Sequence, residues 1–432
     1  MKAARLEMAR NTAKLLCFGL LVVCLAAVAQ TQTAPRYKFD AEWPKLPLPN
    51  KWWMMGITGL AVDKDDNIWV LTRPNDIDET QNYAELNPPT AECCVKPPAI
   101  IAFDQQGNVI RSFNPPQGHG MVVDRKGFVW IGSDTVRKYD GKTGQLVGAI
   151  ARIPETQPGG GGGGDGAPAA APAGRGGAGA GAAATARGGG AGAGAGARGG
   201  GDAPAAGGGG GGRGGNAAAL AAFRAKYPPD TPMIVGGIEE VRTDDAVNEI
   251  YVLDNYLNGR VMVFDMDTLA FKRGWGAYGK PLAEISTTPV TTYDPKAPPA
   301  RDFVNHVTIQ ISRDGFVYAA DRRACRIQVY TKQGKFIKEF FLATETLNRG
   351  SAGGIAFSAD MQQRYMFISD ISNNTIWILN REDGKLLGRI GSAGDNGGQF
   401  HGLHMIATDS RGNIYTGEVQ AGERVQRFVL QR

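Results

Sequence analysis

This 432-residue sequence has few long apolar runs, little net charge and little helical periodicity. Beyond residue 29 no apolar stretch is long enough to span a bilayer, which argues against a membrane-spanning protein. The net charge is +5, of which residues 1–29 contribute +3 and residues 158–216 contribute +2, so the remainder is near neutral. This balance argues against nucleic acid as a partner. The scarcity of 3.6-residue periodicity argues against a helical fold.

Cysteine is scarce, and only Cys93, Cys94 and Cys325 lie beyond the first 29 residues. An odd number of cysteines cannot pair completely. The adjacent Cys93 and Cys94 leave three interpretations open, namely a disulfide between neighbours, a metal site, or two thiols packed in a proline-rich loop.

The first 29 residues have the pattern of a secretory signal peptide. Four basic residues precede an apolar run over residues 15–28, and Ala27-Val28-Ala29 forms a small-x-small cleavage site. We therefore expect a secreted or periplasmic protein that has no membrane attachment after cleavage.

Residues 158–216 consist almost wholly of glycine and alanine with scattered arginine and proline. Such a segment has little apolar surface to bury, so burial cannot offset the entropy lost on ordering. We predict a disordered insertion within a domain, because patterned sequence resumes on both sides.

The rest of the chain repeats one pattern, in which an apolar run, a polar turn and an aromatic-containing run end at a polar residue. Six copies begin at Gly59, His119, Gly237, His306, Gly354 and His404. Six copies of a four-stranded unit predict an all-β, six-bladed β-propeller. The last copy supplies only three strands, and we expect residues 36–43 to add the fourth and close the ring.

This interpretation divides the chain into four parts. Residues 1–29 form the signal peptide, and residues 30–157 form the closing strand and blades 1 and 2. Residues 158–216 form the insertion, and residues 217–432 form blades 3–6. We expect a monomer.

Three of the four histidines fall at one position of the repeat. His119, His306 and His404 stand at the start of the innermost strand in copies two, four and six. Alternate blades of a six-fold ring are a third of a turn apart, so these side chains should converge on the axis and bind a catalytic zinc ion. The alternative is that each histidine bonds a backbone carbonyl. His401 is out of phase and is expected to be a loop residue or a partner of a ligand.

The second strand of each blade returns to the face where the first began. That places Arg73, Tyr256 and Arg322 around the same opening as the histidines. A phenol beside a metal and a guanidinium should have a lowered pKa, and Tyr256 could then act as a general base. An arginine could hold an anionic substrate. The alternatives are a solvated charge for Arg73, a packed rim aromatic for Tyr256, and a structural ion pair between Arg322 and Asp321.

On these motifs the sequence resembles the NHL-type propellers of the peptidyl-α-hydroxyglycine α-amidating lyase (peptidylamidoglycolate lyase) family. The motifs are "GHGM" at His119, "VNHV" at His306, "GLHM" at His404 and "DNYLNGR" at Tyr256, with Arg73 in "VLTRP" and Arg322 in "ADRRACRIQ". The resemblance implies zinc bound by the three histidines, with Tyr256, Arg73 and Arg322 as catalytic residues.

This sequence departs from the family at two positions beside the third histidine. A methionine of the family corresponds to Gly402, two residues before His404. An aspartate that binds structural calcium corresponds to Met405, so the resemblance supports calcium less than zinc.

The expected function is therefore that of an exported zinc-dependent lyase. It would cleave the C–N bond of an α-hydroxyglycine-like carbinolamide, a small molecule or a peptide, to give an amide and glyoxylate. Two alternatives stay open. One is a non-catalytic propeller that binds protein or glycan ligands, and the other is a metal-dependent hydrolase of the lactonase type.

Overall fold

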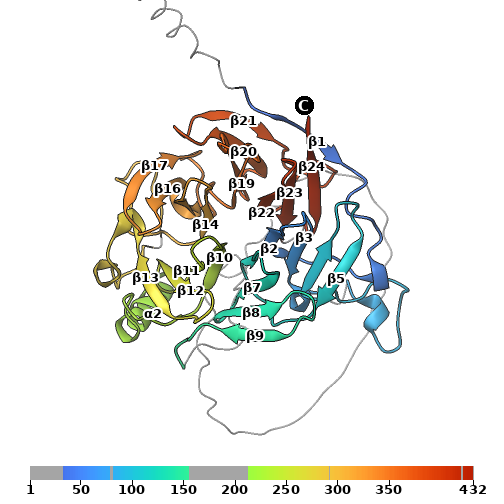
Figure 1. Cartoon of the computed structure of the whole chain (residues 1–432), viewed down its shortest axis with the longest axis horizontal. Helices are drawn as coiled ribbons and strands as arrows, with labels where there is room; N and C mark the ends of the chain where they lie inside the picture. The colour runs from blue at the N-terminus through green and yellow to red at the C-terminus, as the bar shows by residue number, and fades with distance from the viewer. Residues whose placement is uncertain (1–32, 78–80, 155–212, 291, 420–421, 432) are drawn as a thin grey trace, which may run out of the picture.

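The computed structural model describes residues 33–77, 81–154, 213–290, 292–419 and 422–431. These residues form six four-stranded antiparallel sheets, arranged as the blades of a ring (Figure 1). Blade 1 comprises β2 (Ile57–Val62), β3 (Ile68–Thr72), β4 (Ile100–Phe103) and β5 (Val109–Phe113). Blade 2 comprises β6 (Met121–Val123), β7 (Phe128–Gly132), β8 (Val136–Asp140) and β9 (Leu146–Ala149). Blade 3 comprises β10 (Ile238–Asp244), β11 (Glu249–Asp254), β12 (Arg260–Asp265) and β13 (Phe271–Trp275). The predicted six-bladed β-propeller is confirmed.

The remaining blades follow the same order along the chain. Blade 4 comprises β14 (Val307–Ile311), β15 (Phe316–Asp321), β16 (Arg326–Thr331) and β17 (Phe336–Phe341). Blade 5 comprises β18 (Ile355–Phe357), β19 (Tyr365–Asp370), β20 (Thr375–Asn380) and β21 (Leu386–Ile390). Blade 6 comprises β22 (Leu403–Thr408), β23 (Ile414–Glu418), β24 (Val425–Gln431) and β1 (Arg36–Asp40). The first strands β2, β6, β10, β14, β18 and β22 contact one another around the ring, so they are the innermost strands.

The apolar side chains of the blades pack between neighbouring blades. In β3, Ile68 and Val70 join a cluster shared with blade 6, whereas Trp69 and Leu71 join a cluster shared with blade 2. Successive side chains of a strand point to opposite faces, so a blade that is covered on both sides needs apolar residues at consecutive positions. This is why the strands appear in the sequence as short continuous apolar runs.

Aspartates organise the turn between the first two strands in several blades. In blade 1, Asp63 accepts hydrogen bonds from the backbone N–H of Asn67 (2.9 Å) and from the indole of Trp69 (2.9 Å). Asp124 makes the same pair of contacts in blade 2, with the N–H of Phe128 and the indole of Trp130. One carboxylate thus fixes both the turn and a tryptophan side chain of the returning strand.

The N-terminal strand closes the ring. Strand β1 pairs with β24 from Arg36 opposite Gln431 to Asp40 opposite Arg427. The guanidinium of Arg427 donates to the Asp40 carboxylate at 2.8 and 2.5 Å. The expected closing strand is present, and it covers an edge of blade 6 that would otherwise be open to pairing with another chain.

The structure contains one α-helix among the described residues that the sequence analysis did not predict. Helix α2 spans Arg213–Lys226 and leads into blade 3, and it overlaps the predicted insertion 158–216 only at residues 213–216. The alanine-rich run after Asn216 has high helix propensity, which explains the helix. The rest of that segment and the predicted signal peptide lie outside the described residues. No helix among the described residues is long and apolar enough to cross a membrane.

Short 3-10 helices occur in the connections between strands. They are η1 (Pro49–Lys51), η2 (Pro74–Asp76), η3 (Tyr83–Glu85), η4 (Ala277–Gly279), η5 (Leu282–Glu284) and η6 (Arg322–Ala324).

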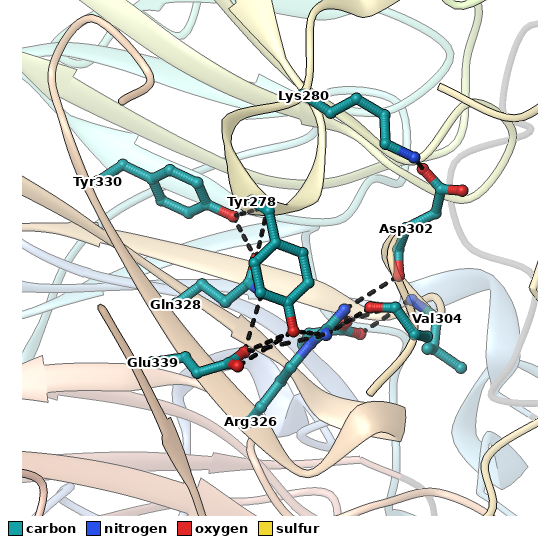
Figure 2. A network of polar contacts seen from close by, with 10 residues as sticks. Tyr278, Lys280, Asp302, Val304, Arg326, Gln328, Tyr330 and Glu339 are labelled. Carbon is teal, nitrogen blue, oxygen red and sulfur yellow. Dashed lines mark hydrogen bonds and ion pairs between the residues drawn. The ribbon is translucent and has the colours of Figure 1, made fainter. Parts of the chain in front are cut away.

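A buried arginine holds the connection from blade 3 to blade 4. Arg326 donates to Asp321 (2.9 Å), to the carbonyl oxygens of Ala300 (2.7 Å) and Asp302 (3.0 Å), and to the Tyr278 hydroxyl (3.0 Å; Figure 2). The Tyr278 hydroxyl also contacts Glu339. Because this connection leads directly into β14, the network fixes the start of the innermost strand of blade 4.

Candidate metal centre

One backbone hydrogen bond recurs where the innermost strands begin, on the side of the ring that we call the histidine face. A residue just after the second strand donates its N–H to the carbonyl of the residue before the first strand. The pairs are Arg73 to Gly56 (3.1 Å), Tyr256 to Gly237 (3.1 Å), Arg322 to His306 (3.0 Å) and Val419 to Gly402 (2.9 Å), with Tyr256 two residues beyond its strand and the others one residue beyond theirs. Arg73, Tyr256 and Arg322 therefore occupy equivalent positions on this face, in blades 1, 3 and 4.

A β-bulge interrupts the innermost strand in three blades. The register shifts between Ile57 and Gly59, between Ile238 and Glu240, and between Leu403 and Met405. The extra residues are Thr58, Glu239 and His404. A bulge re-aims the side chain of the extra residue away from the regular alternation, and bulges are frequent next to functional sites.

His119 and His404 lie together, and each bonds the backbone of a neighbouring blade. The Nδ1 atom of His119 is 2.6 Å from the carbonyl oxygen of Glu239, and Nδ1 of His404 is 3.1 Å from that of Ile57. A carbonyl oxygen only accepts, so each Nδ1 donates an N–H, and in the neutral imidazole Nε2 is then the nitrogen that keeps a lone pair. The two ring centroids are 5.0 Å apart, and both residues are at most 6 % exposed.

This arrangement is compatible with both interpretations of these histidines, a bond to a backbone carbonyl and a metal ligand. Each does bond a backbone carbonyl, and it does so through Nδ1. Metal-binding histidines commonly donate their other N–H to a carbonyl, which fixes the tautomer and the orientation of the ring.

The sequence analysis missed the third member of the cluster, Glu239. One donor atom from each of His119, Glu239 and His404 lies within 4.8 Å of the other two. Glu239 is 1 % exposed, and its Oε2 atom accepts no hydrogen bond from any described residue. The sequence does place acidic residues next to Gly237, but the bulge that directs Glu239 toward the histidines is not visible in a two-residue alternation.

His306 adjoins this cluster through Glu239. Its Nδ1 atom lies 3.3 Å from Oε1 of Glu239, and its ring centroid is 5.0 Å from that of Tyr256. Burial, followed by the nearby Arg322 cation, lowers the pKa of His306 to about 4, so its imidazole is neutral at neutral pH. Burial acts to raise the pKa of Glu239, but His306, His119 and Arg322 together lower it below its usual value. The carboxylate is therefore ionised.

Tyr256 stands beside two of the histidines. Its ring centroid is 5.0 Å from that of His306 and 6.2 Å from that of His119. Its backbone lies against Gly237, whose φ is +74°, and a Cβ atom there would lie 2.6 Å from Cβ of Tyr256. Only glycine suits this position, and the close approach fixes where the tyrosine side chain begins.

The two predicted arginines are both buried. Arg322 is close enough to His306 and Glu239 to shift both pKa values, whereas Asp321, its proposed structural partner, pairs with Arg326 instead. Arg73 is not a solvated charge. It lies 3.6 Å from Asp76, and its Nε–H is buried and finds no acceptor among the described residues.

His401 lies away from this cluster. Its side chain is 53 % exposed, and its Nδ1 atom lies 2.9 Å from Asp395 in the same loop. As expected, it is a loop residue.

The cysteine interpretations are also resolved by the structure. Cys93 and Cys94 form a disulfide in the connection between β3 and β4, and Cys325 is a buried free thiol. Burial raises the pKa of Cys325, which is typical of an unreactive thiol.

The donor set fits a zinc ion. Two neutral imidazoles and a carboxylate are ligand types found in catalytic zinc sites. The unsatisfied Oε2 of Glu239 is the observation that tests this fit, because a buried carboxylate oxygen without a partner is costly and a cation would satisfy it.

No protein-family model matches the chain, and no curated protein matches it significantly. Solved structures similar to it include a streptogramin B lyase, with 12% identity, 91% of this chain and 98% of that chain covered, and a TM-score of 0.44. Virginiamycin B lyase from Staphylococcus aureus has 10% identity, 92% and 90% coverage, and a TM-score of 0.42. The Swd1 β-propeller domain from Myceliophteria thermophila has 12% identity, 87% and 84% coverage, and a TM-score of 0.42. At these identities the likeness says nothing about activity.

Proposed function

We propose that this protein is an exported, zinc-dependent lyase that cleaves the C–N bond of α-hydroxyglycine-like carbinolamides. The observation that carries the proposal is the buried cluster of His119, Glu239 and His404, which lies on the same face as Tyr256 and two buried arginines. Ligands, a candidate base and anion-binding groups thus gather where the innermost strands begin. The substrate is a small molecule or a peptide.

The metal would be held by His119 and His404, with His306 and Glu239 alongside them. When bound, zinc supplies a Lewis acid that polarises a substrate oxygen. Four neutral or acidic side chains from blades 2, 3, 4 and 6 would then surround one cation. No single blade could supply this set.

Tyr256 is the proposed general base. As phenolate it takes the proton of the substrate hydroxyl, and the oxygen electron pair forms the C=O bond of glyoxylate as the C–N bond breaks. The electron pair of that bond goes to the nitrogen, which takes up a proton and leaves as an amide. The tyrosine returns the proton, so atoms and charge balance over the cycle.

The arginines would hold the acidic end of the substrate. Arg322 lies beside His306, and Arg73 occupies the equivalent position in blade 1. Guanidinium groups bind carboxylates through two parallel hydrogen bonds, and the buried Nε–H of Arg73 has no acceptor among the described residues.

A direct test uses the mature chain, residues 30–432. Bound zinc would be measured first, and then the release of glyoxylate from α-hydroxyhippurate. We expect turnover in the wild type, and a loss of about 10²–10⁴-fold in Tyr256→Phe with zinc still bound. Turnover should also fall in His306→Ala. Zinc without turnover would favour the binding propeller.

Glu239 favours one second candidate, a metal-dependent hydrolase of the lactonase type. Carboxylate ligands are typical of that chemistry, and Glu239 places one in the cluster. Hydrolysis of simple lactones by the zinc-loaded protein, without glyoxylate release from hydroxyhippurate, would support this candidate over the lyase.

A further inference from the structure

Glu239 contacts the cluster through both its backbone and its side chain. Its carbonyl oxygen fixes His119 at 2.6 Å, and its Oε1 atom lies 3.3 Å from Nδ1 of His306. Its second carboxylate oxygen, Oε2, is buried and accepts no hydrogen bond from the described residues. One carboxylate oxygen thus contacts His306, and the other has no hydrogen-bond donor among the described residues.

We propose that Glu239 is itself a metal ligand, so that the protein donors are His119, His404 and Glu239. His306 then orients the carboxylate through Oε1. This inference rests on the proposed metal-dependent function, but it assigns a different ligand set from the three histidines expected from the sequence.

The distances favour this assignment. The donor atoms of His119, Glu239 and His404 lie within 4.8 Å of one another, a separation that an ion between them can bridge. His306 reaches the cluster through an imidazole–carboxylate contact made by Nδ1. A histidine that bonds the carboxylate of a ligand is a common means of fixing that ligand.

A purely structural role explains Glu239 less well. A buried carboxylate that served only to pair with His306 would leave one oxygen without a partner, which is unfavourable. Glu418, a buried carboxylate on the same face in blade 6, shows how such a group is normally satisfied. Its Oε1 atom accepts from Arg424 (2.8 Å) and Gln426 (2.7 Å), and its Oε2 atom accepts from the N–H of His401 (2.6 Å).

The charge of a zinc ion also favours Glu239 as a ligand. Imidazole ligands leave both positive charges of a zinc ion uncompensated in a buried site, whereas a carboxylate ligand cancels one of them. Burial of a divalent cation is costly unless it is paired in this way.

The test compares zinc affinities by competition with a chromophoric chelator. Glu239→Gln preserves the size of the side chain and its contact with His306, and it should weaken zinc binding by more than about 100-fold. His306→Ala removes a partner of a ligand and should weaken binding by about 10–100-fold. Glu418→Gln is the matched control and should bind zinc as the wild type does.

Two outcomes separate this inference from the proposed function. If the wild type binds zinc and Glu239→Gln binds it equally well while His306→Ala does not, the three-histidine site is correct and Glu239 is not a ligand. If the wild type binds no zinc, the proposed function itself fails.

A second measurement needs no variant and so does not depend on how the variants fold. X-ray absorption of the zinc-loaded wild type should report two imidazole ligands and additional oxygen ligands. Three imidazoles would overturn the assignment of Glu239.

Discussion

The Nδ1 atom of His404, in the last blade, lies 3.1 Å from the carbonyl oxygen of Ile57, in the first. Residues 347 positions apart in the chain therefore meet at the seam where the ring closes. The same seam is closed on its outer side by β1 and β24. Closure of the fold and orientation of a candidate metal ligand thus depend on one another.

Gly402 provides a test of this dependence. Its φ is +91°, and its carbonyl oxygen accepts a hydrogen bond from the N–H of Val419. A Cβ atom at this position would lie 2.4 Å from the carbonyl oxygen of Val419. Gly402→Ala should cost about 1–3 kcal/mol of backbone strain. It should also weaken zinc binding, because His404 follows two residues later. Thermal unfolding and zinc titration measure the two effects.

Gly412 is the matched control for Gly402. It lies in the same blade with φ of +88°, but in the turn at the opposite end of β22, and the nearest atom to its Cβ would be in the flexible side chain of Leu430. Gly412→Ala should lower stability without changing zinc affinity. Equal zinc affinities in both variants would contradict the coupling at Gly402.

Arg224 in helix α2 should position Tyr256. The buried guanidinium donates to the carbonyl oxygens of Leu257 (2.5 Å) and Ser286 (2.9 Å). A lysine cannot span both acceptors, so Arg224→Lys should release the turn that carries the tyrosine. We expect kcat to fall by about 10-fold or more, since small displacements of catalytic groups are costly. Zinc affinity should stay unchanged, and a parallel loss of zinc would point to general unfolding instead.

Glu249 should contribute to stability in a pH-dependent way. Arg273 holds its carboxylate at 2.7 and 2.6 Å, and this pairing lowers the pKa of Glu249 to about 2. A carboxyl group whose pKa is lowered by folding stabilises the protein above its unfolded pKa, and that stability is lost as the pH falls toward 2.

The corresponding variant is Glu249→Gln. At pH 7 it should lose about 2 kcal/mol of the free energy of unfolding, and the difference from the wild type should shrink between pH 4.5 and 2. Denaturant unfolding across this range measures it, with the exposed Glu382→Gln as control. A difference that stays constant with pH would contradict the role of the ion pair.

The sequence was sufficient for the fold and for part of the site. Repeated apolar runs predicted six blades because each blade is buried on both faces, and the phase of the repeat placed Arg73, Tyr256 and Arg322 on one face. The position of Glu239 could not be predicted, because a β-bulge adds one residue to the strand and turns this side chain away from the face that a regular alternation gives it. Helix α2 was missed because the glycine-rich run before it masked the alanine-rich residues that form it.

The central claim is that side chains from separate blades share one metal ion, and zinc stoichiometry tests it most directly. The wild type, dialysed against limiting zinc and then assayed by elemental analysis, should retain one zinc per chain. A His119→Ala, His404→Ala double variant that still folds, as judged by its thermal unfolding, should retain none. A zinc-free wild type, or a double variant that keeps its zinc, would contradict the account.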